Sequence, residues 1–380
     1  MKNNRFAALL TGILFGVMPA GVLAGCACGE ALVRAQDGAA EAVGKEEIVC
    51  IAPTENGEVQ LMNDVVREFL GNYSEGYSKK WKNPGDLYKM KEVELSWAAE
   101  GAVCYTVSVG RDFAFHIAEK YVTAKNSLSV GNLIPGATYY WKVKAMYADG
   151  IEAVSDIFSF RTEEGLRQID IEGVSNSRDL GGIEAFGGQR VKYGMIYRSA
   201  TLENITPAGI YECRRLGIRT ELDIRNGGEG GAGESSPLGY VKYIHVPGAA
   251  YTYPDLGFND ETNRAQFREE IRAVADADNY PLLFHCSVGR DRTGTLAAVL
   301  YALLGVSEED ILKDYELSFL SAAGTQDGSD ANTMVNSCKM VIGYLYGFGG
   351  ETLRECTENF LLYIGVTQAE IDGIRNILLA

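Results

Sequence analysis

The segment from Cys286 to Arg292 constrains the fold of this chain more than any other. A short apolar run, Pro281-Leu-Leu-Phe284, precedes it and is typical of a buried central strand, and the residues from Thr293 to Leu304 after it are apolar nearly all round. A strand, a loop and a helix in this order bring backbone N–H groups together at a helix start, where they bind anions. Gly289 in mid-loop permits backbone angles that a Cβ atom would obstruct. The sequence therefore predicts an anion-binding loop at the carboxyl end of a strand.

The side chains of this loop suit nucleophilic attack on phosphorus. Cys286 would be the nucleophile, because converging N–H groups, the helix start and Arg292 all favour its thiolate. Arg292 offers a planar fork that can grip two oxygens of a phosphate monoester. Thr293 would donate a hydrogen bond to the Cys286 sulfur and help it to leave a cysteinyl-phosphate when water attacks. The predicted phosphate ligands are Ser287, Val288, Gly289, Arg290, Asp291 and Arg292.

The string His285-Cys-Ser-Val-Gly-Arg-Asp-Arg-Thr-Gly294 resembles the loop His-Cys-x-x-Gly-(Lys/Arg)-Asp-Arg-Thr-Gly of a bacterial branch of the tyrosine phosphatase superfamily. Other blocks resemble the same branch in the same order: Asn176-Ser-Arg-Asp-Leu-Gly-Gly182, Tyr197-Arg-Ser-Ala-Thr-Leu202, Leu222-Asp-Ile-Arg225, and Asp314-Tyr315 with Ser318. The resemblance covers about residues 169 to 377. It implies an α/β cysteine-phosphatase fold, with a central sheet flanked by helices, and a phosphomonoester hydrolase that needs no cofactor.

The resemblance also implies that Asp291 is the proton donor to the leaving group. The branch usually carries Lys before this Asp, and Arg290 stands there in this chain, which keeps the charge but replaces a compact ammonium by a broad fork. Asp255 and Asp260 are the alternative acids. Both follow the strand expected to end at Val246, in a loop where other tyrosine phosphatases carry a mobile acid.

Three more residues are expected to support the loop. His285 would face away from the substrate and orient backbone. Arg178 and Asp179 could contact substrate or lock the following Gly-Gly turn to Arg225, and we favour the structural role. The three histidines of the chain show no metal-ligand spacing, so no metal site is predicted.

Residues 168–380 alternate strand-like and helical runs, which predicts an α/β domain. The expected strands are Met195–Tyr197, Thr220–Ile224, Tyr240–Val246 and Pro281–Cys286. The expected helices are Thr206–Leu216, Asn263–Ala277, Thr293–Leu304 and one that Ser307 opens as its cap.

Residues 46–165 are expected to form a β-sandwich. Apolar and polar residues alternate in several runs, notably Val93–Trp97, Tyr105–Val109 and Tyr140–Ala145. The segment Leu133-Ile-Pro-Gly-Ala-Thr-Tyr139 looks like the tyrosine corner of fibronectin type III domains, and that resemblance covers about Lys91 to Thr162. Residues 57–88 fit it poorly, and Asn63–Leu70 is expected to be a short helix in an insertion.

Residues 1–26 read as an export signal. Lys2 and Arg5 precede an uncharged apolar run, and Leu23-Ala-Gly-Cys26 resembles a bacterial lipobox in which Cys26 receives lipid. The alternative is ordinary cleavage near the same place. Residues 27–45 would then be a linker. We expect an exported protein, either anchored to a membrane through lipid on Cys26 or secreted.

The formal charge of −16 argues against a nucleic-acid partner. Cys338 and Cys356 could form a disulfide, whereas most of the cysteines are expected to be small buried residues. The partner would be a phosphorylated protein, a phosphoinositide or an inositol phosphate. A different class of function stays open, namely an exported protein that senses or binds phosphate with weak or no turnover.

Overall fold

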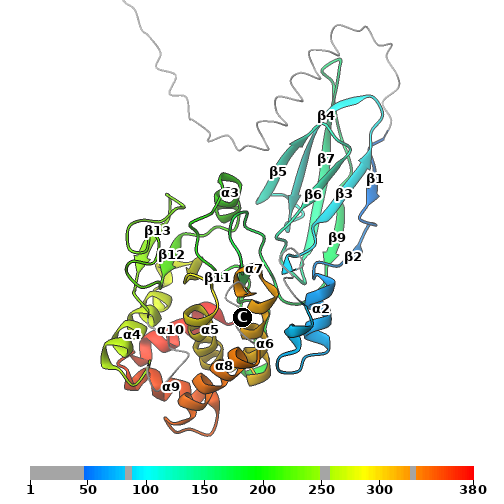
Figure 1. Cartoon of the computed structure of the whole chain (residues 1–380). Coiled ribbons are helices and arrows are strands. Elements are labelled where there is room, and N and C mark those ends of the chain that lie inside the picture. Colours follow the sequence, from blue (N-terminus) through cyan, green and yellow to red (C-terminus); the bar gives the residue numbers. More distant parts are fainter. Residues whose placement is uncertain (1–46, 82–87, 249–256, 326–330) are drawn as a thin grey trace, which may run out of the picture.

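A computed structural model of the chain describes residues 47–81, 88–248, 257–325 and 331–380. Figure 1 shows a β-rich N-terminal part beside a part in which helices surround a sheet. The expected signal, linker and lipidation site at Cys26 lie outside the described residues, as does Asp255. Within the described ranges, no helix is both long and apolar enough to cross a membrane.

The N-terminal part contains two sheets. The first has the order β1-β3-β6, with bounds Val49–Ala52, Val93–Ala98 and Ser127–Val130. The second has the order β2-β9-β7-β4-β5, with β8 paired to β7, and the bounds are Gly57–Val59, Phe158–Thr162, Thr138–Tyr147, Ala102–Gly110, Ala118–Thr123 and Glu152–Val154. Side chains of both sheets share one core, so this part is the β-sandwich expected from the sequence.

The core of the sandwich follows from the alternating pattern of its strands. Trp97 of β3 and Trp141 of β7 face each other with ring centroids 6.4 Å apart, and both are almost fully buried. The hydroxyl of Tyr139 accepts a hydrogen bond from the N–H of Ile134 at 2.9 Å. This bond ties the start of β7 to the preceding turn.

Two short helices interrupt the sandwich between β2 and β3. These are α2 (Asp64–Gly71) and the 3₁₀ helix η1 (Tyr77–Lys80). Asn63 caps α2 by accepting from the N–H of Val65 at 2.9 Å, as the sequence predicted for a helix in this region. The buried face of α2 packs against residues of the C-terminal part.

The second part has a five-stranded sheet of order β10-β11-β14-β12-β13. Its strands are Arg178–Asp179, Ile196–Ser199, Leu282–His285, Thr220–Asp223 and Lys242–His245. All neighbours are parallel except β10 and β11. The α-helices around it are α3 (Pro207–Arg215), α4 (Glu261–Ala275), α5 (Asp291–Leu304), α6 (Glu308–Leu317), α7 (Ala322–Thr325), α8 (Ala331–Tyr346), α9 (Leu353–Tyr363) and α10 (Gln368–Leu378). The short 3₁₀ helices are η3 (Phe186–Gly188), η4 (Ala277–Asn279) and η5 (Ser318–Leu320).

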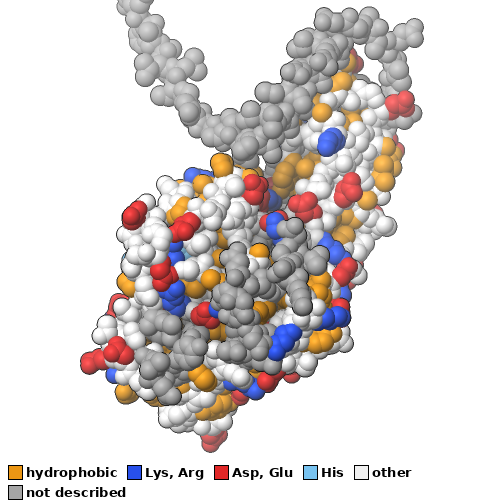
Figure 2. Space-filling model, in the orientation of Figure 1, with side chains coloured by type: hydrophobic (Ala, Val, Ile, Leu, Met, Phe, Trp, Pro, Cys, Tyr) orange, Lys and Arg blue, Asp and Glu red, His pale blue; other side chains and the backbone are white. Residues whose placement is uncertain are grey.

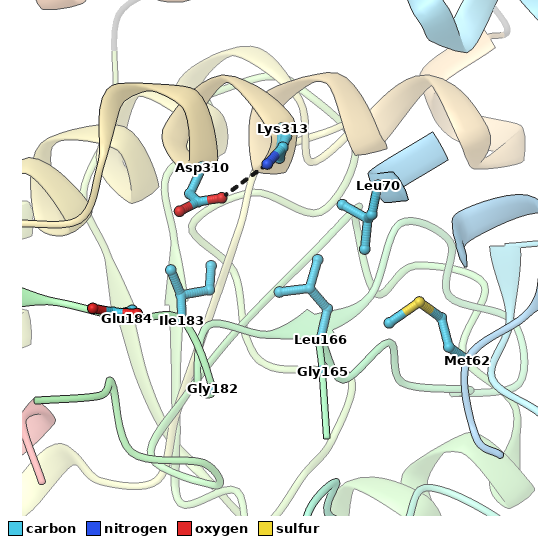
Figure 3. Close-up of a pocket in the computed structure, with 9 residues that line it drawn as sticks. All are labelled: Met62, Leu70, Gly165, Leu166, Gly182, Ile183, Glu184, Asp310 and Lys313. Atoms are coloured by element: carbon cyan, nitrogen blue, oxygen red, sulfur yellow. Dashed lines mark hydrogen bonds and ion pairs between the residues drawn. The ribbon is translucent and has the colours of Figure 1, made fainter. Parts of the chain in front are cut away.

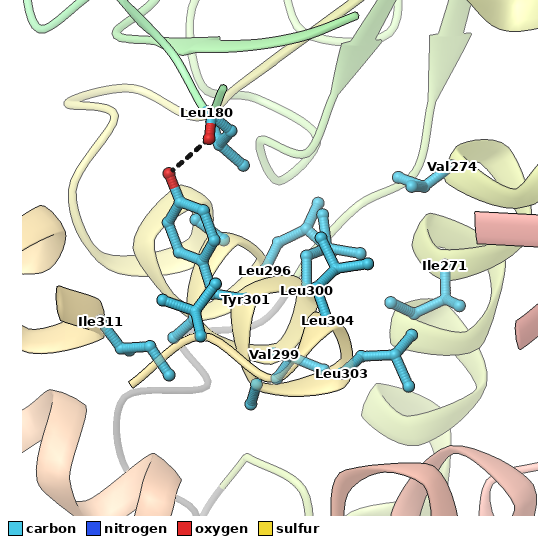
Figure 4. Close-up of a cluster of buried hydrophobic side chains, with 14 of the residues drawn as sticks. Leu180, Ile271, Val274, Leu296, Val299, Leu300, Tyr301, Leu303, Leu304 and Ile311 are labelled. Carbon is cyan, nitrogen blue, oxygen red and sulfur yellow. Dashed lines mark hydrogen bonds between the residues drawn. The ribbon is translucent and has the colours of Figure 1, made fainter. Parts of the chain in front are cut away.

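Helix α5 lies at the centre of this part, as its apolar sequence predicted. Every residue from Thr293 to Leu304 is buried. Figure 4 shows the helix surrounded by apolar side chains, with the hydroxyl of Tyr301 donating to the carbonyl of Leu180 at 3.1 Å. Gly305 ends the helix in the left-handed conformation. The helix start is therefore held rigidly against the end of β14.

For Cys338 and Cys356, the structure agrees with the expectation of small buried residues and does not form the disulfide that the sequence left open. Cys338 and Cys356 are both free thiols, on α8 and α9 respectively. Each is almost fully buried, so each fills space in the interior as a small apolar side chain instead of pairing.

Candidate active site

The loop that begins at Cys286 lies at the carboxyl edge of the parallel strands. Strand β14 ends at His285, and helix α5 begins at Asp291. The strands on either side, β11 and β12, end in register with β14 at Ser199 and Asp223. Cys286 is a free thiol and only 3% exposed. Ligand sites of parallel sheets lie at this edge.

The carbonyl oxygens of Ser287–Gly289 are bound from behind the loop. The N–H of Thr201 donates to the first at 3.1 Å. Asn176 Nδ2 donates to the carbonyls of Val288 and Gly289 at 3.1 and 3.0 Å. Arg198 Nη2 also donates to the carbonyl of Gly289, at 2.7 Å. Within the described residues, the N–H groups of these three positions donate no hydrogen bond. They are therefore available to an anion in front of the loop.

Buried charges hold this support in place. Asp314 of α6 pairs with Arg178 at 2.7 Å and with Arg198 at 2.5 Å, and all three side chains are nearly inaccessible to water. Burial alone would raise the pKa of Asp314, but the two guanidinium groups lower it below its ordinary value. Asp314 is therefore ionised, and it fixes both arginines.

Gly289 is required by both space and conformation. Its φ is +70°, and a Cβ atom there would lie 2.3 Å from the carbonyl oxygen of Ser199. Any other residue would displace the loop from the end of β11.

His285 lies beside Glu221 and the carbonyl of Cys286. Its Nε2 lies 2.9 Å from Glu221 Oε1, and its Nδ1 lies 3.2 Å from the carbonyl oxygen of Cys286. Glu221, Asp223 and His285 form the one buried group of possible metal ligands among the described residues. Their atoms are already engaged, since Ser236 donates to Glu221, and Arg225 and Tyr243 donate to Asp223. The group therefore works as a hydrogen-bonded support and would have to break these bonds to hold an ion.

Arg292 is paired with a residue that sequence reasoning missed. Its Nη1 and Nη2 donate to the two carboxylate oxygens of Glu229 at 2.9 and 2.8 Å, and the hydroxyl of Ser287 also donates to Glu229. The hydrogen bonds from Arg292 hold the pKa of Glu229 at about 2, with a smaller lowering from Ser287. Nη1 also donates to the carbonyl of Ile224 at 3.5 Å, so three of the five N–H donors of the guanidinium are used and two remain for an anion.

Asp291 and Thr293 begin α5. The carboxylate of Asp291 pairs with the side chain of Arg290 at 3.1 Å. Thr293 is fully buried, and within the described residues its hydroxyl has no hydrogen-bond partner. The contact expected from Thr293 to the Cys286 sulfur is therefore not formed in this structure.

Arg178 and Asp179 both have structural contacts, in keeping with the role we favoured. Asp179 accepts from the N–H groups of Gly181 and Gly194 at 2.8 and 2.7 Å. Its ion pair is with Arg167, so the expected link to Arg225 was wrong. Arg225 instead pairs with Asp223, which is two residues earlier and already within reach.

Asp260, the second alternative acid, caps a helix. Its carboxylate accepts from the N–H of Asn263 at 3.0 Å and so begins α4.

The structure has a pocket of about 240 Å³ away from this loop. Figure 3 shows that it lies between α6, which contributes Asp310 and Lys313, and residues near α2, which contribute Met62 and Leu70. The remaining lining residues are Gly165, Leu166, Gly182, Ile183 and Glu184. None of the loop residues lines this pocket, and its Asp310 and Lys313 already pair with each other at 3.3 Å. It is a gap where the two parts meet and not the reactive site.

Replacing Glu229 by Gln should lower the free energy of unfolding by about 1 kcal/mol at neutral pH. The pKa of Glu229 falls from 4.5 to about 2 on folding, so the ionised group stabilises the fold fully above pH 4.5. That contribution is lost as the pH falls from 4.5 towards 2. Urea unfolding should therefore show the difference between the wild type and E229Q narrowing from pH 7 to about pH 3.5, with full convergence only near pH 2.

The matched control is Glu234→Gln, because Glu234 is exposed in the same loop. Its unfolding free energy should equal that of the wild type at both pH values. If the unfolding free energy of E229Q were lower than that of the wild type by the same amount at both pH values, the charged pair between Glu229 and Arg292 would be contradicted.

Known proteins resemble this part of the chain. Residues 169–380 match the tyrosine phosphatase family. A Cupriavidus necator protein provisionally named a tyrosine-protein phosphatase is 30% identical over 172 residues, which are 40% of this chain and 63% of the relative. A protein of Nostoc commune named tyrosine-protein phosphatase is 26% identical over 213 residues, covering 47% of this chain and 72% of the relative. The family match extends over more than half of the chain, and this chain therefore belongs to the tyrosine phosphatase family.

Proposed function

We propose that this protein hydrolyses phosphate monoesters, with Cys286 as the nucleophile and a cysteinyl-phosphate intermediate. The observation that carries the proposal is a free cysteine at the start of a loop whose carbonyls are bound from behind. The forward-facing N–H groups and Arg292 would hold the three non-bridging oxygens of the phosphate. Membership of the family supports the same chemistry.

The reaction would proceed in two displacements. The Cys286 thiolate attacks phosphorus, so that an S–P bond forms while the P–O bond to the leaving group breaks. The leaving oxygen takes a proton from a general acid. Water then attacks phosphorus, the S–P bond breaks, and inorganic phosphate and the thiolate are released. The buried hydroxyl of Thr293 would donate to the departing sulfur after a small change of rotamer.

Wild-type protein should hydrolyse a generic aryl phosphate under reducing conditions, and Cys286→Ser should abolish turnover, by about 10³-fold or more. The serine variant should still bind inorganic phosphate, because the N–H groups and Arg292 are unchanged. An absence of wild-type turnover from mildly acidic to mildly basic pH would favour the alternative, a phosphate-sensing or phosphate-binding protein. Turnover that survived in the serine variant would exclude Cys286 as the nucleophile.

Asp291 is the proposed general acid. It stands at the first position of α5, within the loop, and its side chain is 36% exposed. The carboxylate contacts the side chain of Arg290, so this ion pair would have to open before Asp291 reaches the leaving group. Asp260 is occupied as a helix cap, which leaves Asp255 as the other candidate.

Asp291→Asn should lower kcat about 10²-fold for a substrate with a poor, alkoxide-like leaving group and far less for one with a good leaving group. A good leaving group departs without a proton, so it needs no acid. Steady-state kinetics on the two substrates measure the difference. If Asp255→Asn showed this dependence and Asp291→Asn did not, the acid would be Asp255.

We propose a singly phosphorylated substrate, of the phosphotyrosine kind, in preference to phosphoinositides or inositol polyphosphates. Further phosphate groups would need further cations. The two arginines of the loop pair with Glu229 and Asp291, and neighbouring Arg225 pairs with Asp223 and Glu203. On the described part of the face in Figure 2, basic and acidic side chains are interspersed. The names of the relatives agree with this preference.

A phosphotyrosine peptide should be hydrolysed with a kcat/KM at least about tenfold above that for a phosphoinositide bisphosphate or inositol hexakisphosphate, which corresponds to about 1.4 kcal/mol. All substrates would be compared at one ionic strength, because screening changes the attraction of multiply charged ligands. A preference for the polyphosphates would contradict the charge argument while leaving the mechanism intact.

The localisation is also a proposal. We propose that the protein is exported and reaches a membrane through lipid on Cys26, because residues 23–26 carry the lipobox-like ending. Secretion after ordinary cleavage is the alternative.

A further inference from the structure

We propose that Tyr88, in the N-terminal part, is a positioning residue for the phosphate loop, and that α2, η1 and Tyr88 together form a brace for the active site. The proposal rests on the function proposed above. It assigns a role to the segment between β2 and β3, which the β-sandwich itself does not need.

The brace is packed firmly against the C-terminal part. Val66 and Phe69 of α2 are fully buried against Leu317 and Leu320, at the end of α6 and in η5. In Figure 1, α2 lies beside α6. This apolar contact keeps the brace next to the helix that carries Asp314.

A buried carboxylate on α6 fixes the brace further. Glu316 has no exposed surface, and its two oxygens accept from the N–H groups of Gly76 and Ser78 at 3.0 and 2.8 Å. These N–H groups stand at the start of η1, where they lack helical partners. A charged acceptor with two backbone donors holds the two segments at a defined distance.

Tyr88 extends this contact to the loop. Its ring is 4% exposed, and its hydroxyl accepts from Arg178 Nη1 at 3.2 Å. The same Nη1 donates to Asn176 Oδ1 at 2.6 Å. Asn176 Nδ2 in turn donates to the carbonyls of Val288 and Gly289. Three consecutive hydrogen-bonded links therefore join the N-terminal part to the peptide groups that would bind phosphate.

The orientation of Asn176 depends on this arrangement. Its backbone φ is +56°, which is neither a helical nor a strand conformation. The orientation of its side chain is therefore set by the hydrogen bonds that the side chain makes. Arg178 fixes its oxygen, which turns the amide nitrogen towards the loop carbonyls. Tyr88 and Asn176 restrain Nη1 of the guanidinium, while Asp314 restrains its Nε and Nη2. Loss of the hydroxyl would remove one of the two acceptors of Nη1 and so weaken the restraint on the amide of Asn176 and, through it, on the two loop peptides.

The test is Tyr88→Phe, which removes one oxygen and keeps the ring. Calorimetric binding of tungstate, a tetrahedral oxyanion, should weaken about 3- to 10-fold, and kcat for an aryl phosphate should fall by a similar factor. The pH profile should not move, because the titrating groups of the loop are unchanged. Tyr77→Phe is the matched control: it also removes a hydroxyl from the brace, one that donates to Glu68 and does not reach Arg178, and it should bind tungstate like the wild type.

A double-mutant cycle separates positioning from general destabilisation. Asn176→Ala should weaken tungstate binding by itself, and Tyr88→Phe should add nothing on that background if it acts through Asn176. Glu316→Gln offers a second route, since it loosens the brace without touching Arg178, and it should weaken binding in the same direction. Wild-type affinity in Tyr88→Phe, or losses that add fully in the cycle, would overturn the proposal.

The two proposals fail separately. If the wild type bound tungstate but hydrolysed no phosphate ester, the proposed catalytic function would be contradicted. A tungstate affinity that still depended on Tyr88 would then continue to support the brace.

Discussion

The binding of the loop carbonyls from behind is the interaction on which the rest of the active site depends. A peptide group is planar, so a carbonyl that is held towards the protein turns the following N–H away from it. Thr201, Asn176 and Arg198 hold three successive carbonyls in this way. Gly289 allows the tight path, with its φ of +70°. On the proposed function, the loop would offer an anion N–H groups that are already oriented, which is the arrangement that gives electrostatic catalysis its strength.

This preparation requires charges to be buried. Arg178, Arg198 and Asp314 are all withdrawn from water, and isolated burial of any one of them would cost several kcal/mol. The cost is offset because each charge has a partner of opposite sign and several further hydrogen bonds. Such a network has few alternative arrangements, so it fixes the position of α6 relative to the loop. The brace then adds Tyr88 and the N–H groups of Gly76 and Ser78 to the same helix.

The sequence was informative where the signal was local. The apolar run before Cys286, the glycine of the loop and the apolar helix after it are neighbours in the chain, and the strand, the loop and α5 followed from them. The alternating strands of the sandwich, the short helix α2 and the cap at Ser307 were also readable. These features depend on backbone sterics and burial, which a short window of residues expresses fully.

The contacts missed from the sequence all join distant residues. Glu229 lies 63 residues before Arg292, in a glycine-rich stretch with no pattern of its own. Tyr88 lies 90 residues before Arg178. Asp179 was expected near Arg225 but pairs with Arg167, because the antiparallel bridge between Gln168 and Arg178 brings the chain back there. An ion pair needs only two compatible side chains, so composition offers many candidates and the fold selects among them. One clue to Glu229 was present, because a largely buried arginine such as Arg292 needs a carboxylate partner.

The electrostatics of the site also explain how an acidic protein can bind an anion. Each arginine of the loop already has a carboxylate partner, so little positive field extends beyond the loop at physiological ionic strength, where the screening length is about 8 Å. Attraction must therefore arise at contact, from N–H groups and from the guanidinium donors that Glu229 leaves free. A site of this kind would distinguish ligands by how well one tetrahedral group fits it. Additional phosphate groups on the ligand would add little to its affinity. On the proposed function, the same pairing that orients Arg292 would also restrict the range of substrates, so that orientation and selectivity would have a common cause in Glu229.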